Sequence, residues 1–122
     1  MGIFSTKIQR LEKKSAYLLD VTRKELTERI NSPVPDVAKN ATLIGSKVEK
    51  VVMDYSYLKA KYENDFEVSL EIAEDYYKLL ATAGYLLLMK NDDGEFQILQ
   101  RKYRLGMLEI ENIEKKFDIL LK

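Results

Sequence analysis

The sequence predicts an all-α fold, an antiparallel bundle of four long helices in one domain that spans residues 1–122. Apolar residues recur along most of the chain at alternating intervals of four and three, the coiled-coil-like spacing of a buried helix face. Only five Gly and two Pro occur, while 46% of the residues are hydrophobic and 33% are charged, a composition that favours helices over a turn-rich β fold. A chain of 122 residues is long enough to bury a core without metals or disulfides.

The first helix is expected over residues 5–30 and has the weakest apolar pattern of the four. Ser15 and Thr22 stand at positions where a buried helix face would carry apolar side chains. We therefore expect this helix to cover its neighbours poorly.

The second helix is expected over residues 35–62. Pro33 and Pro35 fall in a first turn whose backbone N–H groups have no partners within the helix, and Ser32 is the candidate N-cap. The apolar ladder of this helix consists of Val37, Ala41, Ile44, Val48, Val51, Tyr55, Leu58 and Tyr62.

The third helix is expected over residues 65–90, and its beginning is less well defined. Asn64 and Glu67 have the spacing of a capping box, which predicts a helix start. No Gly or Pro enforces a turn at this point, however. The alternative is one continuous helix over residues 35–90 with a four-residue insertion in the heptad pattern.

The fourth helix is expected over residues 95–121, after a turn at residues 91–94 with the sequence Asn-Asp-Asp-Gly. An unbroken apolar ladder from Phe96 to Leu120 favours this helix. The alternative is a β-hairpin over residues 85–100 around the same turn.

Two glycines indicate how the third and fourth helices pack. If these helices are antiparallel, Gly84 lies opposite Tyr103 and Gly106 lies opposite Leu80. Large side chains would then meet small ones at both levels, as facing core layers do.

Composition excludes several classes of function. The chain has no His and no Cys, so it lacks His-based acid–base catalysis, thiolate nucleophiles and sulfur-based zinc sites. Twenty basic and twenty acidic residues give a net charge of zero, so no specific binding of nucleic acid is expected. The longest apolar stretch, residues 79–89, is too short to span a bilayer. We expect a soluble, cytoplasmic protein without a cofactor.

One alternative function is metal-dependent hydrolysis. In the predicted bundle, Glu71 and Glu74 are level with Glu111 and Glu114, and carboxylate oxygens are ligands that Mg²⁺ and Mn²⁺ prefer. The pattern Glu71-x-x-Glu74-Asp75 resembles part of the acidic motif of the all-α nucleoside triphosphate pyrophosphatases, which implies a magnesium site on bundle helices. The resemblance covers three residues of one helix and lacks the family's second, paired motif. A solvated acidic face is the favoured interpretation.

Another alternative places the basic first helix on a membrane surface or a nucleic acid. Residues 1–31 hold seven basic and four acidic residues, a net charge of +3. Such a face is typical of ordinary protein surface, and also of a surface that contacts phosphates.

The leading hypothesis is a non-enzymatic protein–protein interaction module: an adaptor, an inhibitor or a small subunit. The third helix carries a second apolar stripe in addition to its bundle-facing one, and a single-chain bundle usually needs only one. Either the other helices of the same chain cover this second stripe, or a second chain, identical or different, covers it. We expect the second chain, acting through an interface formed by Ile72, Tyr76, Leu79, Leu86, Leu105 and Leu108.

Overall fold

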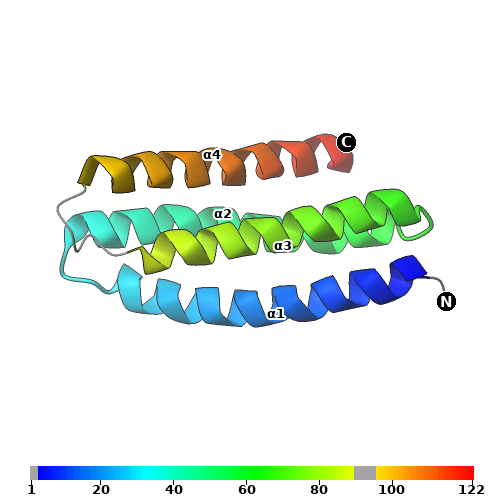
Figure 1. Cartoon of the computed structure of the whole chain (residues 1–122), viewed down its shortest axis with the longest axis horizontal. Helices are drawn as coiled ribbons and strands as arrows, with labels where there is room; N and C mark the ends of the chain where they lie inside the picture. Colours follow the sequence, from blue (N-terminus) through cyan, green and yellow to red (C-terminus); the bar gives the residue numbers. More distant parts are fainter. Residues whose placement is uncertain (1–2, 90–95) are drawn as a thin grey trace.

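The computed structural model describes the backbone of residues 3–89 and 96–122 and the side chains of residues 6–89 and 100–122. Within these ranges the chain forms four α-helices and no strand (Figure 1). The helices are α1 (Ile3–Ile30), α2 (Pro35–Lys61), α3 (Phe66–Leu88) and α4 (Phe96–Leu121).

The predicted all-α antiparallel bundle is confirmed, and the helix bounds differ from those expected by two residues at most. The predicted break between the second and third helices is confirmed as well, because a turn separates Lys61 from Phe66. The alternative β-hairpin is wrong: Tyr85–Leu88 and Phe96–Gln100 are helical. The turn expected at residues 91–94 lies outside the described residues.

The helix starts use other caps than those predicted. Pro35 is the first residue of α2, as expected, but Ser32 does not cap this helix. Its hydroxyl instead accepts a hydrogen bond of 3.2 Å from the backbone N–H of Val34 within the preceding turn. Asp65 caps α3 by accepting from the Val68 N–H at 3.2 Å, one residue after the predicted Asn64. A short acidic side chain there satisfies one of the free N–H groups of the first turn.

The helices form a layered arrangement with a central pair (Figure 1). α2 and α3 each contact the other three helices, whereas the described parts of α1 and α4 do not contact each other. α1 and α4 thus flank the central pair from opposite sides (Figure 1). Consecutive helices are antiparallel, so that α1 runs parallel to α3 and α2 runs parallel to α4. A bundle with helices at the corners of a square would bring α1 and α4 together; this one leaves them apart.

The predicted interface residues of α3 are covered by its own chain, which overturns part of the predicted interface. Leu79 has no exposed surface and Leu86 is 5% exposed, and Ile72 and Tyr76 are buried as well. The expectation that a second chain must cover these four side chains is therefore wrong. Tyr76 stacks on Tyr55 of α2, with ring centroids 4.1 Å apart and planes 9° from parallel.

These residues lie on the side of α3 that meets α2 and α4: Tyr76 stacks on Tyr55 of α2, and Leu86 lies against Gly106 of α4. α1 covers the neighbouring side of α3, where Gly84 meets Thr22. Ser15 and Thr22 are 2% and 1% exposed, and α1 is the neighbour with which α3 packs most extensively. Small side chains let two helix backbones approach closely, so these positions bring α1 nearer instead of weakening its cover. The expectation that α1 covers its neighbours poorly is wrong for this reason.

The two glycines face other residues than predicted. A Cβ atom at Gly84 would lie 3.6 Å from Oγ1 of Thr22 on α1, so this glycine does not face Tyr103. A Cβ atom at Gly106 would lie 2.7 Å from Cδ2 of Leu86, so the large partner is Leu86 and not Leu80. Large meets small at Gly106, whereas Gly84 belongs to the contact of α3 with α1 and faces the small side chain of Thr22.

None of the helices in the described ranges combines the length and the apolar character needed to cross a membrane.

Candidate interaction surface

The exposed face of α3 and α4 carries four large apolar side chains. Tyr85 and Leu88 lie one turn apart on one face of α3, and Leu105 and Leu108 lie one turn apart on α4; each is at least half exposed. Leu105 and Leu108 are the two residues of the predicted interface that the structure places on the surface, at 59% and 51% exposure. We call these four residues the α3–α4 surface.

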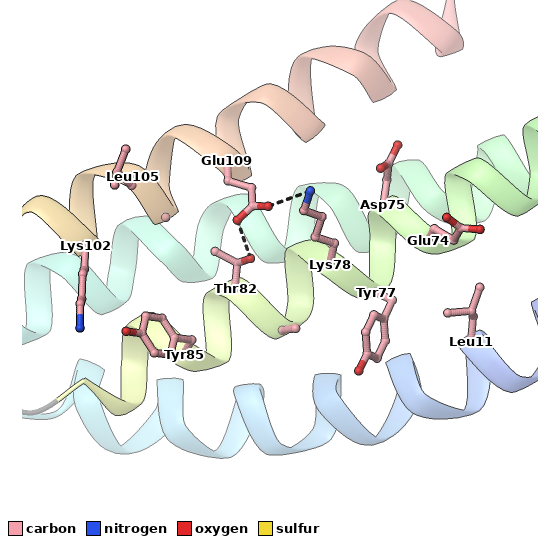
Figure 2. A pocket seen from close by; sticks show the side chains of 12 residues that line it. Leu11, Glu74, Asp75, Tyr77, Lys78, Thr82, Tyr85, Lys102, Leu105 and Glu109 are labelled. Atoms are coloured by element: carbon pink, nitrogen blue, oxygen red, sulfur yellow. Dashed lines mark hydrogen bonds and ion pairs between the residues drawn. The ribbon is translucent and has the colours of Figure 1, made fainter.

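A hollow of 780 Å³ adjoins this surface, where α1 and α4 lie apart on either side of α3 (Figure 2). Figure 2 shows Tyr77 and Tyr85 projecting from α3 on the side of α1, and Lys102 projecting from α4 toward the hollow. Leu105 and Gly106 line the α4 wall, and the lining is mainly apolar. The complete lining is Leu11, Glu74, Asp75, Tyr77, Lys78, Ala81, Thr82, Tyr85, Lys102, Leu105, Gly106 and Glu109.

Polar contacts fix the alignment of α3 and α4 beside the hollow. The Glu109 carboxylate is 3.1 Å from the Lys78 ammonium and accepts a hydrogen bond of 3.1 Å from the Thr82 hydroxyl (Figure 2). One helical turn or more away, the Lys116 ammonium contacts Glu71 and lies 2.7 Å from Asp75. Hydrogen bonds to these two carboxylates raise the pKa of Lys116 above its ordinary value. The ionisable groups of this region therefore serve to hold the two helices in register.

The predicted carboxylate cluster does not form. Glu71 pairs with Lys116, Glu74 lies 3.9 Å from Lys7, and Glu114 lies 3.5 Å from Lys47 on α2. Each of these carboxylates is directed to a different cation and not toward the other three. Among the described residues no three acidic side chains converge in a way that could hold a metal ion. The alternative interpretation, a magnesium or manganese site at Glu71, Glu74, Glu111 and Glu114, is therefore wrong.

The charged residues that precede the two exposed leucines of α4 are basic, and those that follow them are acidic. Arg101, Lys102 and Arg104 precede Leu105, and all three are exposed. Glu109 and Glu111 follow Leu108. Sequence reasoning missed this arrangement, because the order of charges gains meaning only once the outward face of α4 is known. The charge order itself is legible in the sequence.

Other apolar residues are exposed as well. Met53 and Tyr57, one turn apart on α2, are 60% and 61% exposed, and Tyr17 on α1 is 70% exposed. None of these three lines the hollow between α1 and α4. Apolar residues are common on protein surfaces. Met53 is therefore a suitable control position for the α3–α4 surface.

An ion pair joins α1 and α2. The Arg23 guanidinium on α1 makes two hydrogen bonds of 2.8 Å to the Glu49 carboxylate on α2. This pair lowers the pKa of Glu49 and raises that of Arg23. Burial raises the pKa of Tyr55 and that of Tyr76, whose rings stack beneath these helices. Arg23, Glu49, Tyr55 and Tyr76 thus take part in the packing of the helices.

The basic face of α1 is exposed as predicted. Arg10, Lys13 and Lys14 lie on the surface, and none of them forms an ion pair with another described residue. Lys7, on the same helix, is 3.9 Å from Glu74.

Comparison of the chain with protein-family models, curated proteins and solved structures finds no match. Its function is therefore inferred from the surfaces described above.

Proposed function

We propose that this chain is a non-enzymatic protein–protein interaction module that binds through the α3–α4 surface. The observation that supports this most is the exposure of Leu105 and Leu108 on one turn of α4, together with the hollow that Leu105 and Tyr85 of α3 both line. Exposed apolar side chains beside a hollow are typical of protein interfaces. A cytoplasmic location, consistent with a cysteine-free chain, belongs to the same proposal.

The energetics favour a partner for these side chains. Burial of a Leu or Tyr side chain from full exposure contributes about 1.5–3 kcal/mol, and these side chains retain about half of their surface. Four such residues would together contribute roughly 3–6 kcal/mol if a partner covered them fully. The fixed loss of rigid-body freedom on binding offsets part of this gain, so we expect a moderate affinity.

The shape and charge of the surface fit an amphipathic helix. A helix presents side chains at intervals of three and four residues, the spacing of Leu105 and Leu108 and of Tyr85 and Leu88. Charges of both signs border the leucines, with Lys102 before them along α4 and Glu109 after them. The expected partner segment thus has an apolar stripe flanked by both acidic and basic residues.

Site-specific photo-crosslinking tests this proposal. A photo-reactive residue replaces Leu108 in one variant and Met53 in the matched control, and both proteins are irradiated with extract of the native host. The proposal predicts one discrete adduct from position 108, absent from position 53, that disappears when Leu105→Glu is added. Equal adducts from the two positions, or an adduct that Leu105→Glu leaves unchanged, would contradict it.

A second candidate function rests on the basic face of α1, where Arg10, Lys13 and Lys14 have no ion pairs with other described residues. Basic side chains on a helix face attract anionic lipid headgroups. Co-sedimentation with vesicles containing phosphatidylserine at low ionic strength tests this candidate. It predicts binding that is lost in the variant Lys13→Glu/Lys14→Glu, and binding that survives this change would contradict it.

A further inference from the structure

We propose that the partner of the α3–α4 surface is a second copy of this chain, bound through antiparallel pairing of the two α4 helices. The inference rests on the proposed function and names the partner for that same surface. In this pairing Leu105 of each copy packs against Leu108 of the other. Arg104 faces Glu111 of the other copy, and Lys102 faces Glu109.

The first step of the argument is the outward stripe of α4. Arg101, Leu105, Leu108 and Asn112 succeed one another at steps of four, three and four, and all four are exposed. The opposite face of the helix is buried in the bundle at Met107 and Ile110. The exposed residues therefore occupy the positions through which a second helix would pack.

The second step is the identity of the residues on the two flanks of this stripe. Lys102 and Glu109 lie seven residues apart on the flank that faces the hollow. Arg104 and Glu111 lie seven residues apart on the other flank. Each flank thus holds one basic and one acidic residue, placed symmetrically about the leucines.

The third step is the consequence of two-fold symmetry. In an antiparallel pair of helices each flank meets the same flank of the partner in reverse order, so a basic residue meets an acidic one on both sides. In a parallel pair each flank meets the opposite flank in the same direction, which places Lys102 near Arg104 and Glu109 near Glu111. Only the antiparallel arrangement makes all four contacts attractive.

The same charge order extends over the neighbouring residues. Residues 100–108 hold three basic residues and no acidic one, and residues 109–114 hold three acidic residues and no basic one. Antiparallel pairing about a point between Leu105 and Leu108 sets these two segments against each other. Moreover, Lys102, Arg104 and Glu111 form no ion pair within the described ranges, so they are available to a partner. Glu109 contacts Lys78 and Thr82 and keeps further acceptor capacity.

Four leucines and four flanking ion pairs make a small interface. We therefore expect a concentration-dependent dimer that weakens with salt, not an obligate one.

Charge exchange measured by analytical ultracentrifugation tests the pairing. Arg104→Glu turns two attractive contacts of the dimer into repulsive ones, and we expect the dissociation constant to rise by roughly tenfold or more. Glu111→Arg should have a similar effect. The double variant Arg104→Glu/Glu111→Arg should return the dissociation constant to that of the unmodified protein. Lys39→Glu, an equal change of charge at an exposed position on α2, should leave it unchanged.

Disulfide trapping tests the direction of the helices, and the absence of native cysteines makes it simple. A mixture of the Leu105→Cys and Leu108→Cys variants is oxidised, and the products are identified by mass spectrometry. Antiparallel pairing predicts disulfides between the two different variants. Disulfides mainly within each variant would indicate a parallel pair and overturn the proposal.

The outcomes separate this inference from the proposed function. A purified protein that stays monomeric while position 108 crosslinks to another protein in extract overturns the dimer and leaves the interaction surface in place. A dimer that Leu108→Glu abolishes but charge exchange does not affect overturns the antiparallel pairing alone. A dimer that survives Leu108→Glu overturns the pairing through α4 and leaves the proposed function to the crosslinking test.

Discussion

The two sides of α3 differ in how the chain covers them. On the side of α1, Ser15 and Thr22 are buried and the helices pack closely. On the side of α4, Leu105 and Tyr85 remain at least half exposed and a hollow separates α4 from α1. The comparison teaches that small facing side chains let a neighbouring helix close tightly over one side of α3. The small residues of α1 complete the core there, whereas Leu105 and Leu108 lie on the outward stripe of α4 and remain exposed.

The largest expected effect is the difference in stability between a charge introduced in the core and the same charge introduced on the surface. Leu79→Glu would place an uncompensated charge in the core, at a free-energy cost of about 3–5 kcal/mol or more, a large part of the stability of a small domain. We expect loss of helicity at 25 °C by circular dichroism. Leu105→Glu introduces the same charge on the surface and should change the free energy of unfolding of the monomer by about 0.5 kcal/mol at most. Similar losses in both variants would contradict the comparison.

The next effect compares the two glycines. A Cβ atom at Gly106 would lie within 3.1 Å of three atoms of the buried Leu86 side chain, so Gly106→Ala forces this core residue to move. We expect a destabilisation of about 1–3 kcal/mol, reduced by the better helix propensity of Ala.

Gly84→Ala is the matched control for this experiment. Its Cβ atom would meet Thr22 Oγ1 at 3.6 Å, an ordinary contact. Helix propensity should then dominate, and Gly84→Ala should stabilise the protein by up to about 1 kcal/mol. Urea denaturation measures both variants, and equal signs for the two would show that the packing at Leu86 has been misjudged.

A smaller effect concerns the polar atoms between α1 and α3. The Ser15 hydroxyl is buried without a hydrogen-bond partner among the described residues. Ser15→Ala removes this unsatisfied group and keeps the side chain small, so we expect stabilisation by about 1 kcal/mol. Thermal unfolding followed by circular dichroism measures it. A lower melting temperature would mean that the hydroxyl has a partner in solution.

The smallest effect is a dependence of stability on alkaline pH. Burial raises the pKa of Tyr76 above its ordinary value of 10.0, so the folded protein holds this proton more tightly than the unfolded chain does. The corresponding stability is present below about pH 10 and is lost as the pH rises through the folded pKa. Tyr76→Phe should therefore flatten the fall in urea midpoint above pH 10, and Tyr57→Phe, at an exposed position, should not. A fall of unchanged slope in Tyr76→Phe would assign the effect to other groups.

The sequence predicts the positions of the helices along the chain well, and the contacts between the helices less well. Apolar periodicity depends on the backbone geometry of one helix, so it located all four helices and the second stripe of α3. Which helix covers an apolar stripe depends on the packing of helices far apart in the sequence, and apolar periodicity carries no information about that packing. Ser15 and Thr22 illustrate this, because a small polar residue at a buried position indicates either poor burial or close approach. The structure shows close approach.

The exposed apolar residues can be predicted only in part for the same reason. The sequence predicts Leu105 and Leu108 outside the main seam of α4, and both are exposed. It also predicts an interface at Leu79 and Leu86, because α3 has two apolar stripes, and both are core residues. The alternative of a carboxylate cluster is wrong because side chains at the same height in a bundle need not point toward one another. Nearby lysines such as Lys116 form ion pairs with carboxylates of this region instead.

Sedimentation velocity of the unmodified protein over a wide concentration range tests the central claim most directly. The account predicts that the apparent mass rises with concentration from the 14.2 kDa of one chain toward twice that value, and that added salt opposes the rise. A mass that stays at 14.2 kDa at every concentration and ionic strength would contradict self-association through α4.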